Sequence, residues 1–442
     1  MQPTPITAII VGAGHRSIGY ADITFSHPDL LRIVGVADPN PIRRQMTRER
    51  YGFSEDMCFS SADELAARGK LADVIINGTL DRLHVETSLP LLDAGYDMLL
   101  EKPFALNEKE ALTLAECADR NGSKVMICHV LRYAPFYLNI KEQIMRGDLG
   151  EIINIQMAEH VSYHHMSIGY VRGKWRNSEE SHSTMLLAKS CHDMDLMMWL
   201  MGKNEPVQVA SFGGRYQFRP EKAPPNAGEI CMVDCPLVDT CEYSSKRLYI
   251  AHPERWGCYV WDALEHLENP TDEDRIALMK SDSRYARCVY KSDNNVVDRQ
   301  SVMINFASGA TGTMNMVGGA AQDRRTISVI GTLGEIFGSF EKGFYTYRRI
   351  NPDKEGFSGG CDERIVDLKQ AVVSDGHGGG DRQMVLDFLN FVRGEPTSPA
   401  CTSIFDSLTG HLAVFKADES RERGGIPLGI PHCVRRQKLS KV

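Results

Sequence analysis

The sequence predicts an α/β domain on a doubly wound parallel sheet, followed by a domain on an open, mainly antiparallel sheet. In the first 130 residues, short apolar runs rich in β-branched residues alternate with helical stretches, as parallel strands joined by right-handed crossovers do. Beyond that point, strand-like segments separated by tight glycine turns replace the alternation. A length of 442 residues also favours two cores over one. We therefore expect domains at 1–130 and 131–442.

The elements of the first domain follow from apolar runs bounded by turn residues. The predicted strands are Ile6–Val11, Arg32–Ala37, Val74–Asn77, Asp97–Leu100 and Lys124–His129. The predicted helices between them are Ile18–Ser26, Pro41–Arg50, Ser61–Arg68, His84–Ala94 and Glu108–Asn121.

The second domain begins with two helices and a strand and continues as a sheet. The predicted helices are Pro135–Arg146, the strongly apolar Ser183–Leu200, Asp381–Arg393 and Ser403–Arg423. The predicted strands are Ile152–Ala158, Gln208–Gly213, Val302–Phe306, Thr311–Met316, Thr326–Gly331 and Glu335–Ser339. Residues 220–298 interrupt the sheet pattern, and we interpret them as an insertion.

Composition excludes several classes of function. The formal net charge of −8 argues against nucleic acid or an anionic membrane as a partner. No apolar run is long enough to span a bilayer, and Met1–Pro5 lacks the basic residues of a signal peptide. We therefore expect a cytoplasmic protein.

A glycine loop follows the first predicted strand, where a dinucleotide would bind. Backbone N–H groups at such a strand–helix turn hold pyrophosphate, and a carboxylate after the second strand binds the ribose 2′-hydroxyl. Asp38 stands at that second position and would repel a 2′-phosphate, which favours NAD over NADP. Arg43 and Arg44 lie near enough to keep NADP as the alternative, although arginines on a helix are more often solvated. The loop residues assigned to the cofactor are Gly12, Gly14, His15, Arg16 and Ser17. Ser17 replaces the third glycine of the usual fingerprint.

Glu101, Lys102 and Pro103 end the fourth predicted strand. An acid beside a lysine orients the lysine side chain, and a cleft that excludes water lowers the pKa of the lysine. Lys102 can therefore bind or transfer a proton. Pro103 fixes the backbone there and is compatible with a cis bond. A surface ion pair at a strand end is the alternative interpretation.

Several motifs in this order resemble the Gfo/Idh/MocA family of oxidoreductases. They are the loop Gly12–Gly19, Asp38, the segment Asn77–His84, Glu101–Pro103 and the His-x-x-Asp stretch His192–Asp195. The resemblance implies a Rossmann domain, an open-sheet second domain, and hydride transfer between a nicotinamide and a sugar or cyclitol hydroxyl carbon, with no metal required. It also implies that Asn77, Thr79, His84, Glu101 and Lys102 line the cofactor. Lys102 and His192 would then be the catalytic pair.

The helix that carries His192 departs from the family pattern. Many members have an aspartate four residues before this histidine, where the sequence has Ala188. At about 100° per residue, Lys189, His192 and Asp195 would share one third of the helix surface. We therefore expect proton transfer to rest on Lys102, His192 and Lys189. The alternative is a core helix whose polar side chains are solvated.

Residue types that bind sugars gather before and after this helix. Aromatic faces stack on pyranose rings, while His, Arg and Asn side chains reach hydroxyl groups. The substrate-binding candidates are Arg132, His160, Tyr163, Tyr170, Trp175, Arg176, Asp195 and His377. His160 and His164 are four residues apart, but the segment that holds them is not predicted as a helix, so a metal site there is not favoured. His377 stands in a glycine-rich segment that reads equally well as a linker.

The insertion carries a group of cysteines. Cys231, Cys235, Cys241 and Cys258 could supply four soft ligands to a structural zinc ion, but their spacing is looser than that of paired C-x₂-C sites. Reduced buried thiols are the alternative, and no metal site is assigned.

These observations predict an NAD-dependent dehydrogenase acting on a CH–OH group of a sugar, sugar derivative or cyclitol. A redox-neutral glycoside hydrolase that passes through a 3-keto intermediate is the first alternative. A regulator that senses NAD or a sugar is the second. We expect a small-molecule carbohydrate ligand and a homodimer or homotetramer, because open sheets pair face to face.

Overall fold

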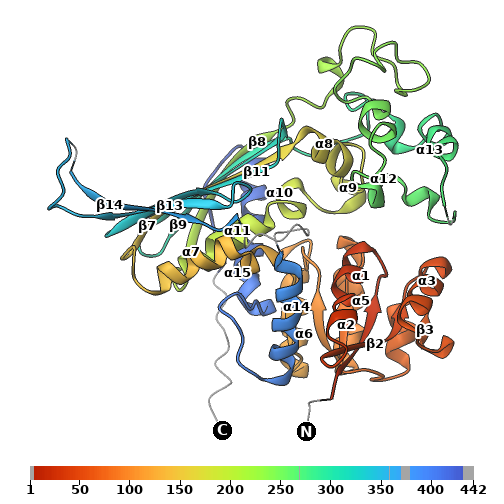
Figure 1. The fold of residues 1–442 in the computed structure, drawn as a ribbon, viewed down its shortest axis with the longest axis horizontal. Helices are drawn as coiled ribbons and strands as arrows, with labels where there is room; N and C mark the ends of the chain where they lie inside the picture. Colours follow the sequence, from red (N-terminus) through yellow and green to blue (C-terminus); the bar gives the residue numbers. More distant parts are fainter. Residues whose placement is uncertain (1–3, 268, 358, 370–378, 432–442) are drawn as a thin grey trace.

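The computed structural model describes residues 4–267, 269–357, 359–369 and 379–431 and contains two sheets (Figure 1). The first sheet has six parallel strands in the order β3-β2-β1-β4-β5-β6. Its strands are β1 (Ile6–Val11), β2 (Leu31–Ala37), β3 (Cys58–Phe59), β4 (Val74–Asn77), β5 (Asp97–Leu100) and β6 (Val125–Ile127). The predicted doubly wound sheet is confirmed, and the order reverses between β1 and β4, where such sheets bind ligands.

Helices and short turns connect these strands. They are α1 (His15–Ala21), α2 (Ile23–Ser26), α3 (Pro41–Tyr51), η1 (Glu55–Met57), α4 (Ala62–Ala67), η2 (Asp81–Leu83), α5 (His84–Asp93) and α6 (Glu108–Asn121). Side chains define several of the starts: Asn40 caps α3, Ser61 caps α4 and Asn107 caps α6. Local sequence chemistry therefore fixes these helices independently of their packing.

The second sheet is mainly antiparallel, as predicted, and has nine strands in the order β14-β13-β12-β11-β7-β10-β9-β8-β15. Among its strand pairs only β7 and β10 run parallel. Its strands are β7 (Ile152–Ser162), β8 (Pro206–Gly214), β9 (Arg299–Phe306), β10 (Thr311–Ala320), β11 (Arg324–Gly331), β12 (Gly334–Ser339), β13 (Phe344–Ile350), β14 (Cys361–Asp367) and β15 (Leu428–Gly429). Buried and exposed residues alternate strictly along β9, so one face of the sheet is covered and the other is open.

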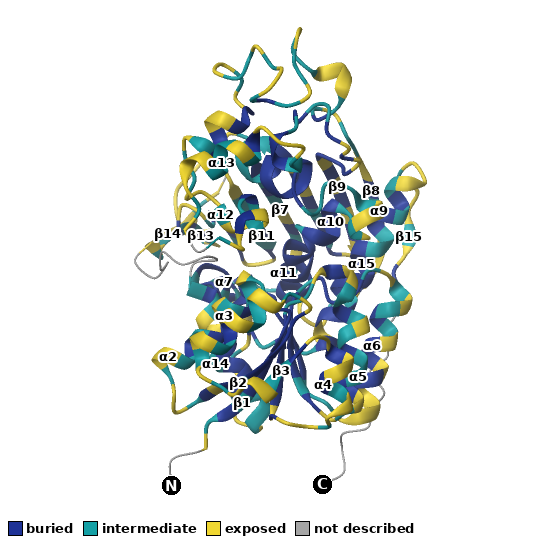
Figure 2. Cartoon of the chain, turned by 90° about the vertical axis from the view of Figure 1, so that its right-hand side faces the viewer, coloured by how far each residue is buried: buried dark blue, intermediate teal, exposed yellow. Residues whose placement is uncertain are grey.

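The buried residues concentrate where the helices of the second part meet the first sheet (Figure 2). The segments between β6 and β8 are η3 (Val130–Tyr133), α7 (Pro135–Met145), α8 (Tyr163–His165), η4 (Met166–Val171), α9 (Ser178–Ser181), α10 (Met185–Ala188) and α11 (Cys191–Met201). The insertion contains η5 (Pro220–Lys222), η6 (Lys246–Ile250), α12 (Gly257–Val260), η7 (Asp262–Leu264), α13 (Asp272–Met279) and η8 (Arg284–Ala286). Every residue of α11 is buried, so this helix forms the core between the two sheets.

The last two helices, α14 (Gly380–Arg393) and α15 (Ile404–Glu422), return to the first sheet. α14 packs against α1, and α15 packs against α6 and α11 (Figure 1). The backbone N–H of Ile127 in β6 donates a hydrogen bond to Thr402 O at 3.0 Å. The two helices thus belong to both halves of the molecule. Within the described residues, no helix is long and apolar enough to cross a membrane.

Candidate active site

Glycines keep the loop after β1 close to the loop after β4. Gly12 has a φ of +75°, and a Cβ there would lie 2.8 Å from the backbone N and Cα of Thr79. A Cβ on Gly78 would lie 2.2 Å from Ser17 Oγ. At Gly14, by contrast, a Cβ would meet nothing within 4 Å. The loops therefore form a cradle of bare backbone with open space at Gly14, which fits a pyrophosphate group.

Asp38 follows β2 and is only 4% exposed. Its Oδ2 accepts a hydrogen bond from Ala13 N at 2.7 Å, and its Oδ1 accepts one from Asn40 N at 2.8 Å. The carboxylate is thereby held beside the glycine loop, at the position where a ribose hydroxyl of a dinucleotide binds. The predicted cofactor residues are brought together in this part of the fold.

Arg16 connects Glu101, which follows β5, to helix α14. Glu101 Oε1 accepts from Arg16 Nε at 3.1 Å and from the Tyr20 hydroxyl at 2.5 Å. Arg16 also forms two hydrogen bonds with Asp381, at 3.0 and 2.8 Å. Burial opposes ionisation of Glu101, but Arg16 and Lys102 outweigh it and lower the pKa of the carboxyl. Glu101 is therefore an anion that fixes Arg16 rather than a proton donor.

Lys102 lies at the carboxyl end of β5, and the bond to Pro103 is cis. Its Nζ donates a hydrogen bond to Ala188 O at 3.0 Å, across the boundary between the two sheets. His84 supports this turn, since its Nδ1 lies 2.7 Å from Pro103 O and its Nε2 lies 3.1 Å from Thr79 O. The ammonium group of Lys102 is thus placed where the first sheet meets α10.

The single helix predicted for Ser183–Leu200 is wrong, because the chain leaves helical geometry at Lys189 and Ser190. α10 ends at Ala188 and α11 starts at Cys191. His192 and Asp195 remain on α11, but Lys189 does not share their face. Its Nζ instead lies 3.1 Å from Glu159 Oε1 on β7. The break exposes the Ala188 carbonyl to Lys102 and separates the predicted trio into two sites.

His192 is 4% exposed and lies beside His129, with ring centroids 5.6 Å apart. Asp195 accepts two hydrogen bonds from Arg132, at 2.7 and 2.6 Å, and its Oδ1 lies 3.6 Å from His129 Nε2. Burial and the Arg132 charge lower the pKa of His129 well below its usual value. Arg132 and Asp195, both predicted to bind substrate, bind each other in this structure and hold α11 against η3.

Lys189 belongs to a second buried cluster of charges under the second sheet. Arg325 Nε lies 2.5 Å from Glu159 Oε2 and 3.1 Å from Asp193 Oδ1. Two acids and two bases thus neutralise each other away from water. Burial, strengthened by Glu159 and opposed by Arg325, raises the pKa of Asp193 to about 7. Burial lowers the pKa of Lys189, although Glu159 opposes this shift.

Trp175 and Tyr170 form an aromatic wall beside the loop after β4. Their rings stack with centroids 5.4 Å apart, and Trp175 Nε1 donates to Asp81 Oδ2 at 2.7 Å. Lys174 Nζ lies 4.3 Å from the Trp175 ring centroid, and burial lowers the pKa of this lysine. Sequence reasoning missed Asp81 and Lys174, although Asp81 lies inside the Asn77–His84 motif and Lys174 precedes Trp175.

His160, Tyr163 and Arg176, also predicted to bind substrate, have the following places and contacts in the structure. His160 Nδ1 lies 2.9 Å from Arg324 Nη2, and Tyr163 begins α8. Arg176 Nε pairs with Asp293 at 2.9 Å, which ties this segment to the end of the insertion. His377 lies outside the described residues.

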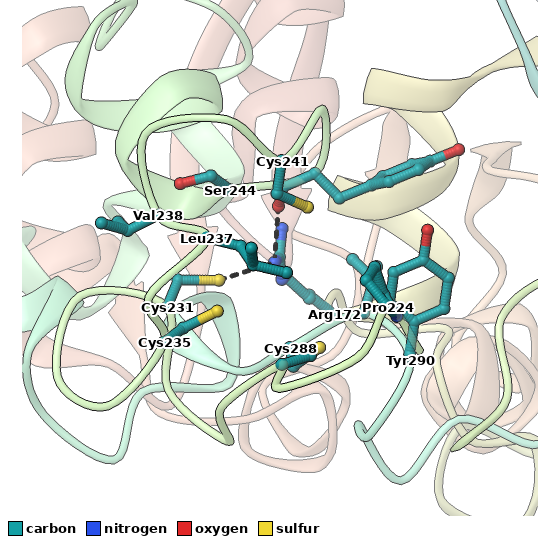
Figure 3. Close-up of a pocket in the computed structure, with 13 residues that line it drawn as sticks. Arg172, Pro224, Cys231, Cys235, Leu237, Val238, Cys241, Ser244, Cys288 and Tyr290 are labelled. Carbon is teal, nitrogen blue, oxygen red and sulfur yellow. Dashed lines mark hydrogen bonds between the residues drawn. The ribbon is translucent and has the colours of Figure 1, made fainter. Parts of the chain in front are cut away.

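The cysteines of the insertion line a small cavity of about 20 Å³, room for one water molecule (Figure 3). Cys288 joins Cys231, Cys235 and Cys241 there, whereas the expected fourth ligand, Cys258, is exposed on α12. A buried Arg172 guanidinium enters the same space and donates to Cys231 Sγ at 3.5 Å. Among the described residues, no three His, Cys, Asp or Glu side chains are arranged to hold a metal ion. The donor set does not fit zinc.

Comparison with known proteins gives matches to both parts of the chain. Residues 6–129 match the Gfo/Idh/MocA model described as "Oxidoreductase family, NAD-binding Rossmann fold", and residues 141–402 match "Oxidoreductase family, C-terminal alpha/beta domain". The putative oxidoreductase YteT of Bacillus subtilis is 24% identical over 371 residues, which cover 81% of this chain and 82% of YteT.

Solved structures show the same fold across nearly the whole chain. The WlbA dehydrogenase of Bordetella pertussis in complex with NADH and UDP-GlcNAcA is 15% identical, with a TM-score of 0.67 over 98% of this chain and all of WlbA (100%). Levoglucosan dehydrogenase in complex with NADH is 17% identical, with a TM-score of 0.67 over 97% of this chain and 100% of that chain.

Proposed function

The chain belongs to the Gfo/Idh/MocA family of NAD-binding oxidoreductases, and on that premise we propose that it transfers hydride between NAD and a hydroxyl-bearing carbon of a sugar, sugar derivative or cyclitol. One observation carries the proposal: Lys102 leaves the nucleotide-binding sheet and reaches the α10–α11 break, next to the helix that carries His192. An ammonium group and an imidazole at the boundary between cofactor and second domain are the groups that alcohol oxidation needs.

The bound nicotinamide would accept the hydride, and the protein would handle the proton. Lys102 polarises the substrate oxygen, and His192 takes the proton as hydride leaves the adjacent carbon. The hydrogen bond to Ala188 O orients the Lys102 ammonium before substrate arrives. Arg132 and Asp195 position α11, and with it His192, from one turn further along the helix.

Lys189 acts indirectly in this proposal, as a member of the buried cluster that it forms with Glu159, Asp193 and Arg325. Its partner Glu159 also holds Arg325, so the lysine cannot swing toward Lys102 without leaving a buried carboxylate short of one cation. We propose a positioning role for Lys189 in fixing the α10–α11 break. The role of Lys189 in proton transfer, expected from the sequence, stays a prediction.

The proposed sugar site is the aromatic wall of Tyr170 and Trp175. Pyranose C–H faces pack on such rings, and the neighbouring Lys174 and Asp81 can bind hydroxyl groups. His160, Tyr163, Arg176 and His377 remain proposed outer contacts. NAD rather than NADP is the proposed cofactor because the Asp38 carboxylate stands at the ribose position. The cytoplasm is the proposed location.

We propose that the open face of the second sheet pairs with another copy of the chain. Large apolar side chains are exposed on its strands, among them Phe212 (65%), Met303 (57%) and Phe337 (59%). Contiguous apolar area of this kind marks an interface. Sedimentation equilibrium of the wild type and of Phe212→Glu/Phe337→Glu tests this, and a monomeric wild type would contradict it.

The dehydrogenase proposal is tested by incubating purified protein with NAD⁺ and a panel of aldoses, uronic acids, glycosides and cyclitols. We expect NADH and a keto product in equal amounts, measured by absorbance and mass spectrometry. Lys102→Met should lower turnover by about 10²–10⁴-fold with NAD⁺ affinity nearly unchanged. The exposed Lys109 gives the control variant Lys109→Met, which should retain full turnover.

The same assay separates the alternatives. Cleavage of aryl glycosides without net NADH would support the redox-neutral glycoside hydrolase. Binding of NAD and sugar without turnover of any substrate would support a sensing regulator.

A further inference from the structure

Described residues of the insertion between β8 and β9 contact the first domain at the glycine loop and at the segment that follows Asp38. The ring of Tyr259 on α12 lies against the ring of His15 in the glycine loop, with centroids 4.9 Å apart. Six residues later, Glu265 contacts the start of α3. Figure 1 shows α12 above α1 and α3. The insertion therefore contacts both the glycine loop and the segment that follows Asp38.

Glu265 binds two side chains that directly follow Asp38. Its Oε1 accepts from Asn40 Nδ2 at 2.7 Å. Its Oε2 accepts from Arg43 Nε at 3.0 Å and lies 2.9 Å from Arg43 Nη2. The side chains of Arg43 and Glu265 are 35% and 34% exposed, so the pair is partly withdrawn from water. Asn40 Oδ1 meanwhile caps α3 by accepting from Ile42 N at 2.9 Å, which leaves its amide pointed at Glu265.

These contacts determine the charge at the ribose end of the groove. The 2′-phosphate of NADP carries about two negative charges, and an arginine just beyond the second strand is the usual group that binds it. Arg43 stands in that region, but its Nε and Nη2 are engaged by Glu265. The rim thus holds two carboxylates, Asp38 and Glu265, and two guanidinium groups: Arg43 is engaged by Glu265, and Arg44 Nη1 donates to the backbone O of Asp38 at 2.6 Å.

We propose that Glu265, contributed by the insertion, is a specificity-determining residue that excludes 2′-phosphorylated nicotinamide nucleotides. It does so by occupying Arg43 and by adding negative charge beside Asp38. The inference rests on the proposed NAD-dependent function and assigns part of the cofactor preference to a segment outside the nucleotide-binding domain.

The test measures dissociation constants of NAD⁺ and NADP⁺ by calorimetry on the full-length protein. Glu265→Gln should bind NADP⁺ about tenfold more tightly, the effect of one unit charge at intermediate dielectric, while NAD⁺ affinity changes less than about threefold. The matched control is Glu273→Gln, which removes an exposed carboxylate on α13 of the same insertion and should change neither constant.

Two variants of Arg43 form the second part of the test. In the double variant Arg43→Ala/Glu265→Gln the gain for NADP⁺ should disappear, because no freed guanidinium remains. Arg43→Ala alone should weaken NADP⁺ binding about tenfold, since it leaves the Glu265 carboxylate without its counter-charge beside the 2′-phosphate.

An unchanged NADP⁺ affinity in Glu265→Gln overturns the inference, as does a gain that survives in the double variant. An unchanged NADP⁺ affinity in Arg43→Ala alone also overturns it, and this result does not depend on how well Glu265→Gln folds. If the wild type binds neither nucleotide, the proposed function itself fails, which is a distinct result.

Discussion

Asp195→Ala is expected to destabilise the protein by about 3–5 kcal/mol, because it leaves the guanidinium of Arg132 buried without a counter-charge. The two side chains are only 3% and 4% exposed, and two hydrogen bonds of 2.6 and 2.7 Å join them. The pair Arg48–Glu55 has a similar distance of 3.0 Å, but Glu55 is 87% exposed. Glu55→Ala should therefore cost less than about 1 kcal/mol.

Urea unfolding followed by circular dichroism measures both effects, with the slope m checked for constancy among variants. Arg132→Leu/Asp195→Leu removes both charges and should be at least about 1 kcal/mol more stable than the sum of the single changes implies. A loss below about 1 kcal/mol in Asp195→Ala, with m unchanged, would refute the reasoning, since the pair would then behave like an exposed one.

Three further predictions concern the cofactor groove and the buried cluster. Gly12→Ala should weaken NAD⁺ binding about tenfold or more in calorimetry, because its Cβ would lie 2.8 Å from the Thr79 backbone. Gly52 has a similar φ of +74°, but a Cβ there would meet nothing within 4 Å. The control Gly52→Ala should therefore cost only about 1 kcal/mol of stability and leave NAD⁺ binding intact. Burial raises the pKa of Asp193 from its ordinary value of 3.8 to about 7 in the folded protein. Because the folded state then binds more protons than the unfolded state, the free energy of unfolding of the wild type should fall as pH rises from about 4 through 7. Asp193→Asn should show roughly 1–4 kcal/mol less of that loss in urea titrations. Superimposable pH profiles would contradict this. Tyr259→Ala should speed NADH release several-fold in stopped-flow displacement, because its ring covers His15; an unchanged rate would show that the contact does not retain the nucleotide.

The sequence was most informative where local chemistry decides the structure. Apolar β-branched runs predicted the long parallel strands, and the glycine loop with Asp38 predicted the nucleotide groove, because strand propensity and positive φ are properties of short segments. β3, with two residues, is too short to produce a pattern. β14 is an exposed edge strand whose polar residues read as a loop.

The site could be predicted only in part because its geometry depends on contacts distant in sequence. No glycine or proline marks the break at Lys189; the partner Glu159, thirty residues earlier, is visible only in the folded chain. Cys288 reaches the cysteine cavity from the far end of the insertion in the same way. Spacing rules could not distinguish it from Cys258.

The ion pair between Arg16 and Asp381 constrains how the protein can be made. Arg16, beside the glycine loop, is synthesised 365 residues before Asp381, which lies on the helix that anchors the loop. The hydrogen bond from Ile127, in the edge strand β6 of the nucleotide-binding sheet, to Thr402 likewise cannot form until Thr402 has been synthesised. A fragment ending near residue 130 would expose the surfaces that α14 and α15 cover, so the nucleotide-binding half is expected to mature only after these two helices have been synthesised.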